Sequence, residues 1–340
     1  MSDVIDVPST AAPRPEAPRT PARTPDREPG CGRSGRWRRG RLAAAGAVVV
    51  ALLMVGHAAV PNVFGNPGSL LETFLPWLGL GVLFCAALAA LRRSASAGVA
   101  VLLAAGVWCA SFGGALLDKR APGGGDLTVV SQNVGAENPD PAGTARVLAA
   151  SGAGLLALEE LSPATTPAYE RALGGAYPHH AAIGTVGLWS AYPLREIEAL
   201  PIMPWTRALR VVADTPKGPV AVYVAHLASV RVHPTAGFTT FHRNEAAGKL
   251  AEIVRAEALP RVILAGDFNG TVEDRALRPV TEGFRSAQAE AGDGFGFSWP
   301  AAFPVARIDH VLVRGGTPVA AWTLPRTGSD HLPVAASLRW

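Results

Sequence analysis

The pattern of apolar and polar residues divides the chain into three parts. Residues 1–41 carry almost no large apolar side chains, residues 42–117 contain long apolar runs, and residues 126–340 alternate short apolar runs with Gly, Pro and polar residues. A segment with so few apolar side chains cannot bury enough surface to offset the entropy of ordering. The first part is therefore predicted to be a disordered tail, and the last part a globular domain.

Three apolar runs in the middle part have the length of membrane spans. They cover residues 42–60, 70–91 and 97–117. At about 1.5 Å per residue, each approaches the roughly 30 Å thickness of the hydrocarbon layer. A cleaved signal peptide explains the first run less well, because two more apolar runs follow it and no convincing small-residue cleavage site does. We expect a three-helix membrane anchor over residues 42–117.

Charge indicates the orientation of these helices. The arginine-rich tail and the loop with Arg92 and Arg93 lie on one side if three helices cross, whereas the loop at 61–69 is uncharged. Positive residues favour the cytoplasmic side. We therefore expect a multi-pass protein of the plasma membrane with a cytoplasmic N-terminus and an extracellular domain, although Lys119 and Arg120 argue mildly against it. A Gly-rich tether at 118–125 would join anchor and domain.

The net charge and the positions of the cysteines limit the kinds of site to expect in the domain. The formal net charge of +4 comes largely from arginines of the tail, so it is weak evidence for nucleic-acid binding. The three cysteines, Cys31, Cys85 and Cys109, all precede residue 126. A disulfide framework or a cysteine-based metal site in the domain is therefore excluded.

Residues 126–340 carry short β-rich runs with a few helices between them. Strands are predicted at 127–134, 155–161, 187–192, 208–214, 220–227, 262–266, 307–314 and 332–339, with a further strand beginning at His179. Helices are predicted at 144–150 and 240–258.

An apolar strand repeatedly ends on a residue that chemistry can use. The run 262–266 is followed by Asp267 and Asn269, which point the same way on an extended chain. Such a sequence alone is equally compatible with an Asx turn. The other residues of this kind are Asn133, Glu160, His226, Asp309, Asp330 and His331. Strand ends that meet at one edge of a sheet stack would bring them into one cleft.

These residue types favour phosphoryl chemistry. Carboxylate and amide oxygens suit Mg²⁺ or Mn²⁺, with Glu160 as the best ligand. A histidine beside a carboxylate suits proton transfer to and from water, and a metal with a base and amide donors stabilises a phosphoryl group under attack. Covalent chemistry has less support, because Ser229 and Ser329 lie near histidines without the setting of a nucleophile elbow.

The order of the motifs resembles the endonuclease/exonuclease/phosphatase (DNase I-like) superfamily. The matching motifs are QNV at 132–134, LEE at 158–160 where the family usually has LQE, AHL at 225–227, GDFN at 266–269, IDH at 308–310 and SDH at 329–331. The resemblance implies an α/β (α+β) fold, a four-layer αββα sandwich of two mixed β-sheets, here preceded by three transmembrane helices.

The resemblance also implies the metal site. Glu160 would be the main ligand of Mg²⁺ or Mn²⁺, and Asn133 and Asp330 would complete or support the site. Glu159 stands where Gln is usual, and it either joins the site or faces solvent.

The remaining motif residues would carry the catalysis. By the resemblance, His331 is the general base and Asp309 orients it. Asp267 would position or activate water, Asn269 would hold the phosphate, and His226 would stabilise the transition state or assist the leaving group.

Arginine and the other histidines give weaker candidates. Arg207, Arg210 and Arg243 could each clamp a phosphate, but a surface arginine is the commoner outcome. The histidines expected to be structural or exposed are His179, His180, His233, His242 and His310.

The layout of three spans and this domain resembles the membrane-anchored teicoplanin-resistance (VanJ-like) proteins. The resemblance implies a metal-dependent phosphohydrolase outside the membrane, acting on the phosphate ester or pyrophosphate of an envelope lipid such as a polyprenyl pyrophosphate, with glycopeptide resistance as the consequence. One alternative is an extracellular DNase/RNase-type phosphodiesterase. No basic loop with interleaved aromatics supports it, so no stable nucleic-acid partner is expected. The other alternative is a non-catalytic envelope ligand-binding protein, which would not need the complete motif set.

Overall fold

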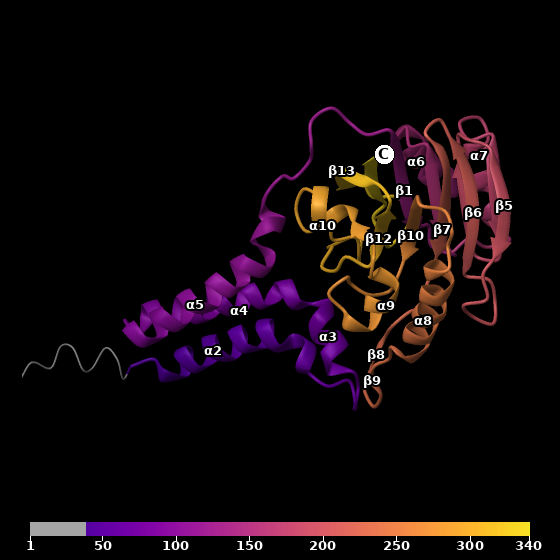
Figure 1. Cartoon of the computed structure of the whole chain (residues 1–340). Coiled ribbons are helices and arrows are strands. Elements are labelled where there is room, and N and C mark those ends of the chain that lie inside the picture. The colour runs from indigo at the N-terminus through magenta and orange to yellow at the C-terminus, as the bar shows by residue number, and fades with distance from the viewer. Residues whose placement is uncertain (1–38) are drawn as a thin grey trace, which may run out of the picture.

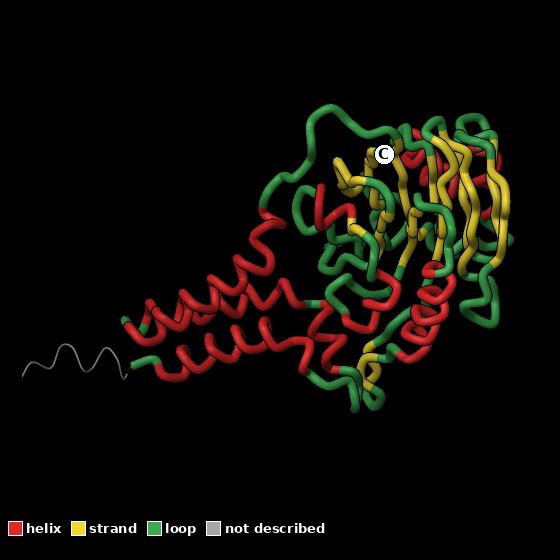
Figure 2. The backbone as a smooth tube through the Cα atoms, viewed as in Figure 1, coloured by secondary structure: helices red, strands yellow, loops and turns green. Residues whose placement is uncertain are grey.

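The computed structural model describes residues 39–340 (Figure 1). The predicted tail at 1–41 lies almost wholly outside these residues, and so does Cys31. Long helices form an arm that projects from a domain built around β-sheets (Figures 1 and 2).

Each sheet has six strands and is mixed. The strand orders are β13-β14-β1-β2-β4-β3 and β11-β12-β10-β7-β6-β5. In the first sheet β1 pairs in parallel with β2 and antiparallel with β14, and in the second β10 pairs in parallel with β7 and antiparallel with β12. The first sheet consists of β1 (Leu127–Asn133), β2 (Leu155–Glu159), β3 (His179–Ile183), β4 (Val186–Ser190), β13 (Thr317–Thr323) and β14 (Val334–Arg339). The second consists of β5 (Leu194–Ala199), β6 (Ala208–Thr215), β7 (Gly218–Ala225), β10 (Val262–Asp267), β11 (Arg285–Ser286) and β12 (Asp309–Arg314).

Apolar side chains hold the layers together on both faces of each sheet. The core between the sheets includes Val129 from one and Val222 and Ile263 from the other. The outer face of the first sheet packs on α6 (Pro141–Ala150) and α7 (Thr166–Leu173), and that of the second on α8 (Phe241–Arg255) and α9 (Arg278–Thr281). The predicted α/β sandwich of two mixed sheets with flanking helices is confirmed.

Three strands of this sandwich had no sequence prediction, and one of them, β11, is only two residues long. Strand β5 is an exposed edge strand with Arg195, Glu196 and Glu198, so it has no apolar run to detect. Strand β13 begins Thr317-Pro318, and a proline is an argument against a strand except at an edge, where β13 lies. The smaller elements are β8 (Val232–His233), β9 (Gly237–Phe238) and α10 (Ala287–Ala291).

The arm contains α2 (Arg41–Gly56), α4 (Leu78–Leu91) and α5 (Ala95–Phe112). Within residues 39–340 two helical stretches, Arg41–Ala59 and Ala95–Leu116, are long and apolar enough to span a membrane. The run predicted as the middle span is instead broken. Its two helices, α3 (Pro67–Thr73) and the stretch Leu75–Leu91, are bent by 72°, so the three predicted spans are not confirmed.

The bend follows from polar contacts between α3 and the domain. Glu72, fully buried, accepts from Arg275 Nη1 at 3.0 Å and contacts His57 Nδ1 at 3.0 Å. Ser69 Oγ donates to Asp274 Oδ1 at 3.2 Å. The predicted start of the second span at residue 70 is therefore not confirmed, because α3 packs on the domain and the long apolar helix begins after it.

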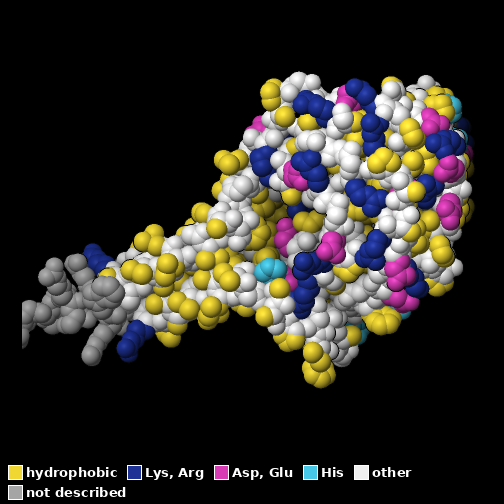
Figure 3. Space-filling model, viewed as in Figure 1, with side chains coloured by type: hydrophobic (Ala, Val, Ile, Leu, Met, Phe, Trp, Pro, Cys, Tyr) yellow, Lys and Arg dark blue, Asp and Glu magenta, His cyan; other side chains and the backbone are white. Residues whose placement is uncertain are grey.

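The surface of the arm is apolar along its length, and its basic residues lie at the tip far from the domain (Figure 3). Arg41 begins α2, and Arg92 and Arg93 lie between α4 and α5. This distribution of charge is compatible with membrane association.

We predict that Glu72→Ala loosens the contact between α3 and the domain. The substitution leaves the mostly buried Arg275 guanidinium without its carboxylate, which costs about 3 kcal/mol for a buried pair. Backbone hydrogen exchange of the full chain in detergent should become at least tenfold faster in α3 and at 271–277. The control, Glu245→Ala, breaks the exposed pair with Lys249 and should leave this exchange unchanged. Unchanged exchange in Glu72→Ala would contradict the assignment.

Candidate active site

Strand alternation brings the candidate residues to one end of the sandwich. In β10, Ile263 and Ala265 face the core between the sheets, and the next residue with that orientation is Asp267. In β12, Val311 and Val313 face the same core, so Asp309 does too.

The same rule places residues from two other strands. His226 follows Val222 and Val224 at the inward positions of β7, and Asn133 follows Val129 and Ser131 at those of β1. Each polar side chain is thus the next inward position after an apolar run, so both sheets contribute to one buried cluster.

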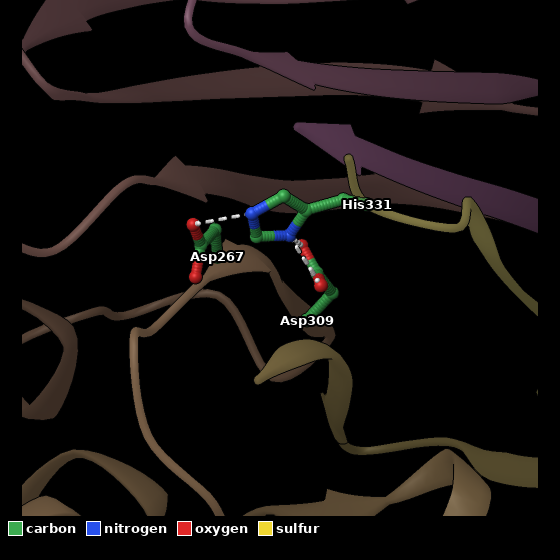
Figure 4. Close-up of side chains that lie close together, drawn as sticks. All are labelled: Asp267, Asp309 and His331. Carbon is green, nitrogen blue, oxygen red and sulfur yellow. Dashed lines mark hydrogen bonds and ion pairs between the residues drawn. The ribbon is translucent and has the colours of Figure 1, made fainter. Parts of the chain in front are cut away.

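Asp309 and His331 form a hydrogen-bonded pair at the centre of this cluster. His331 Nδ1 lies 2.9 Å from Asp309 Oδ2 and 3.1 Å from Oδ1, while His331 Nε2 lies 3.9 Å from Asp267 Oδ2 (Figure 4). Burial opposes the charge on His331, but Asp309 and Asp267 outweigh it and raise the pKa of His331 to about 10. At neutral pH His331 therefore holds a proton on each nitrogen.

Asp267 is the acceptor that connects the cluster. Its Oδ2 accepts from Asn133 Nδ2 at 3.0 Å and Asn269 Nδ2 at 3.2 Å, and its Oδ1 accepts from the Asn269 backbone at 2.8 Å. Burial raises the pKa of Asp267 to about 7 against the opposing effect of the neighbouring imidazolium. Gly266 before it has φ 145°, and a Cβ there would meet the Ala225 carbonyl oxygen at 1.9 Å. Only glycine lets β10 approach β7 this closely.

His226 is neutral in this setting. Burial first, then Arg207 and His331, holds the pKa of His226 well below its usual range. Arg207 donates to His226 Nε2 and to the carbonyl oxygens of His226 and Leu227. The approaches of Nε2 to Asp267 Oδ2 at 3.5 Å and to Glu160 Oε1 at 3.7 Å are therefore not ion pairs.

Glu160 lies at the mouth of the cluster. Its φ of 58° is left-handed, which turns the side chain away from the strand alternation of β2, and 33% of the side chain is exposed. Asn269 is also left-handed, with φ 49°. Glu160, Asp267, Asn269, Asp330 and His331 line one cleft of about 580 Å³.

Two groups of side chains could hold a metal ion. Ligand atoms of Asp267, Asp309 and His331 lie within 4.8 Å of one another. In that group, however, the Asp309 carboxylate already accepts a hydrogen bond from His331 Nδ1, and such a pair is suited to proton transfer. Within residues 39–340 the Glu160 carboxylate accepts one hydrogen bond, from the Ala136 backbone at 3.2 Å, so it keeps free lone pairs toward the cleft. A carboxylate fits the oxygen preference of Mg²⁺ or Mn²⁺, and the Asn133 amide oxygen, which accepts from the Gly135 backbone at 3.0 Å, keeps a second lone pair.

The third predicted ligand lies farther out. Asp330 is exposed on the wall of the cleft, and its Oδ2 accepts from Trp299 Nε1 at 3.2 Å. Asp330 can therefore support a bound cation or its water shell from the wall.

Of the three candidate arginines, Arg207 alone contacts a catalytic candidate side chain. Arg210 lies on the outer face of its sheet, where it donates to Glu257 Oε2 at 2.6 Å, so the expectation that it binds phosphate in the cleft fails. Arg243 is fully buried in an ion pair with Asp274 at 2.6 Å, and its Nη1 donates to the Asn269 carbonyl at 3.2 Å. Arg243 therefore stabilises the backbone turn at Asn269 by its hydrogen bond to the carbonyl oxygen.

The other histidines lie outside the cluster. His310 packs on Phe268 at 5.1 Å between ring centroids, and its Nε2 contacts the Gly270 carbonyl at 2.8 Å, so its role is structural. His180 stacks on Trp189 at 5.7 Å. His179 is half-buried on β3, and His233 and His242 are exposed.

Glu159 neither joins the cleft nor faces solvent. It is fully buried between the sheets, where Ser131 Oγ donates to Oε1 at 3.1 Å and Oε2 has no partner. Burial, then Asp309 and Asp267, raises the pKa of Glu159 well above its usual range. A protonated Glu159 has the shape of glutamine, the residue usual at this place in the motif.

One wall of the cleft could not be found from the sequence. Thr73 and Phe74 line it, although they belong to the run predicted to lie in the membrane. Phe238 and Trp299 line other parts of it. Ser329 is not a free nucleophile, because its Oγ donates to the Asn133 carbonyl at 2.6 Å.

Comparison with known proteins agrees with this geometry. The sequence profile of the Endonuclease/Exonuclease/phosphatase family matches residues 130–331. Similar solved structures include humanized D. rerio TDP2 (20% identity, TM-score 0.51), which covers 62% of this chain and 98% of its own. A functionally unknown conserved protein from Enterococcus faecalis V583 (13%, 0.52) covers 62% and 99%. An endonuclease/exonuclease/phosphatase from Bacteroides vulgatus (13%, 0.52) covers 62% and 98%. At these identities the likeness shows the fold alone. A comparison with curated protein sequences gives no match.

We predict that Asp309→Asn destabilises the chain in a pH-dependent way. His331 has a folded pKa of about 10 against an ordinary 6.5, so its pairing stabilises fully below about pH 6.5 and is lost as pH rises through 10. The variant should be less stable by about 3 kcal/mol at pH 6, and the gap should shrink by pH 10. Thermal unfolding of the full chain in detergent, followed by tryptophan fluorescence, measures it. Asp214→Asn, at an exposed pair with Arg195, is the control. A gap that is constant with pH would contradict the pairing.

Glu159→Gln is expected to stabilise the chain at alkaline pH. The folded state keeps a proton that the unfolded state releases above about pH 4.5, so Glu159 costs stability increasingly as pH rises above that value. The variant should gain about 1–2 kcal/mol at pH 8 and nothing near pH 4.5, as read from denaturant midpoints. The exposed Glu252→Gln should show no such trend. A loss of stability at pH 8 would mean that the carboxylate form is needed.

Proposed function

Because the chain belongs to the endonuclease/exonuclease/phosphatase family, whose enzymes hydrolyse phosphate ester bonds, we propose that it is a membrane-anchored, divalent-metal-dependent phosphohydrolase. Its substrate is the phosphate ester or pyrophosphate of an envelope lipid. The observation that carries this proposal is the wall of the cleft, where Thr73 and Phe74 of the anchor face the same space as Glu160 and His331. A head group bound there stays next to the apolar arm.

The residues of the cluster divide the work as follows. A divalent cation held by Glu160 and Asn133 would supply charge to a phosphoryl oxygen. Asp309 holds the His331 Nδ1 proton and so points Nε2 toward Asp267 and the cleft. Because His331 is doubly protonated and Asp267 has a pKa of about 7, Asp267 is the member of this coupled pair that takes the proton of the attacking water.

The other side of the cleft would stabilise negative charge. Arg207 and the neutral His226 place positive charge and a polarised imidazole beside Glu160 and Asp267. Both Nδ2 hydrogens of Asn269 are used, by Leu227 O at 3.1 Å and by Asp267. Asn269 therefore orients Asp267 in this state, and the proposed contact to phosphate would replace one of these bonds.

We also propose a cytoplasmic N-terminus and an extracellular domain. The helices α2, α4 and α5 each run between the basic tip of the arm and the domain (Figure 1). The stretch Leu75–Leu91 is about 25 Å long at 1.5 Å per residue, and it would cross with its bend at the domain end. Because this layout resembles that of the membrane-anchored teicoplanin-resistance proteins, we propose teicoplanin resistance as the specific role.

Two other functions remain as outcomes of the test. One structure of this fold is D. rerio TDP2 complexed with single-strand DNA product (19% identity, TM-score 0.52), which makes DNA cleavage the alternative reaction. A non-catalytic envelope protein that binds the same ligand is the other.

The test is phosphate release from a polyprenyl pyrophosphate by the full chain in detergent with Mg²⁺. Glu160→Ala and His331→Ala should each lower kcat at least about 100-fold, and a chelator should abolish release. The exposed Glu252→Ala and His242→Ala are matched controls and should retain wild-type rates.

Each contrary result has a separate meaning. Wild-type rates in Glu160→Ala and His331→Ala would show that the site assignment is wrong. Cleavage of single-strand DNA without phosphate release would favour the phosphodiesterase. Binding of the pyrophosphate without turnover would favour the non-catalytic protein.

A further inference from the structure

An apolar pocket of about 420 Å³ lies where the arm meets the domain. Its walls come from the helical turn Leu75–Trp77, α4, α5 and the loop at 295–297, and they include Trp77, Leu83, Ala105, Trp108 and Phe297. None of these residues lines the catalytic cleft. The pocket is therefore a separate hollow formed jointly by the anchor and the domain.

The pocket offers no free polar side chain to a ligand. Trp77 Nε1 donates to the Val305 carbonyl at 2.7 Å, and Trp108 Nε1 donates to the Pro76 carbonyl at 2.8 Å. The one other heteroatom on a lining side chain is the sulfur of Cys109, a weak hydrogen-bonding group. A hydrocarbon is therefore the ligand that fits, because a polar ligand would lose its hydrogen bonds to water.

Stacked aromatic rings join the two parts of the wall. Trp77 stacks on Phe297 at 5.7 Å, Phe297 stacks on Phe295 at 5.1 Å, and Phe295 contacts Trp108 at 6.4 Å. Two of these residues belong to the anchor and two to the domain. The pocket therefore keeps this shape only as long as α3 and the arm remain packed against the domain.

The pocket and the catalytic cleft both share wall residues with a cavity that lies between them. Pro76 and Phe297 line both the pocket and a neighbouring cavity of about 180 Å³. Thr73 lines that cavity and also the catalytic cleft. The three hollows follow one another along the break between α3 and α4.

The pocket also faces outward to the surroundings of the arm. Leu80 and Leu83 line it and are 57% and 66% exposed, on an arm whose surface is apolar (Figure 3). If the arm lies in a bilayer, this side faces the lipid. This side of the pocket is therefore open to a hydrocarbon chain from the surroundings of the arm.

We propose that the pocket holds the hydrocarbon chain of the lipid phosphate substrate while the phosphate lies in the catalytic cleft. This inference rests on the proposed function and specifies it further. The occupant is the chain of the substrate itself, because the pocket and the cleft with Glu160 and His331 border the same intermediate cavity. The enzyme would thus select amphiphilic phosphates by the length of their chain.

The test compares farnesyl pyrophosphate with isopentenyl pyrophosphate, which carry the same reacting group on a long and a short chain. With the full chain in nanodiscs and Mg²⁺, the kcat/KM for the farnesyl compound should exceed that for the isopentenyl compound at least tenfold. Ala105→Phe fills the pocket and should lower kcat/KM for the farnesyl compound about tenfold, chiefly through KM. This factor equals about 1.4 kcal/mol, or about two buried methylene groups. The isopentenyl rate should not change.

The matched control is Ala110→Phe, at an exposed position of the same helix outside the pocket. It should alter neither rate. An equal loss for both substrates in Ala105→Phe, or no loss for either, would overturn the proposal.

A second measurement needs no bulky substitution. Cys109 lines the pocket and is exposed, whereas Cys85 is buried. In a Cys31→Ser chain, farnesyl pyrophosphate should slow maleimide labelling of Cys109 at least threefold, and isopentenyl pyrophosphate should not. Labelling that is unaffected by either compound would contradict a chain in the pocket.

The two proposals fail in different ways. Hydrolysis of both pyrophosphates with no dependence on chain length would overturn the pocket while the proposed function stands. No Glu160-dependent hydrolysis of either would overturn the proposed function, and the inference with it.

Discussion

The hydrogen bond from Asn133 Nδ2 to the Asp267 carboxylate joins the two sheets at the edge where their apolar core ends. Below it the sheets are held by valine, leucine, isoleucine and alanine side chains, and above it lies the cleft. Any carboxylate placed at this boundary is desolvated on one side and needs partners on the other. The amides, imidazoles and guanidinium around Asp267 meet that requirement, and the same groups form the site.

That constraint explains why the buried acids differ in charge. Asp267, Asp309 and Glu159 lie close enough that three negative charges would repel strongly in a medium of low polarity. His331 supplies one compensating charge through Asp309. Burial and the neighbouring carboxylates then favour the protonated form of Glu159, and Asp267 lies near its midpoint at neutral pH. The cluster as a whole therefore holds protons that can move between these side chains when a bound ligand changes the charge of the cluster.

The sequence predicted the sandwich and the set of residues at its edge because both depend on local order. A strand that alternates apolar residues inward must carry the next inward residue to the same face, so Asp267, Asp309 and His226 could be placed before the fold was known. The same alternation puts Arg210 on the outward face of β6, between the inward Leu209 and Val211, and its partner there, Glu257, is 47 residues away in the sequence. The bend after α3 was missed because its cause, Arg275, is distant in sequence from Glu72.

The contacts that link α3 to the catalytic cluster determine which segments of the protein are needed for an intact site. Ser69 binds Asp274, Asp274 binds Arg243, and Arg243 holds the carbonyl of Asn269. A soluble fragment that begins at residue 126 would lack Ser69 at one end of this chain and would open one side of the cleft to water. The structural unit that carries the cleft therefore includes α3, and the apolar arm and the candidate active site share one continuous framework.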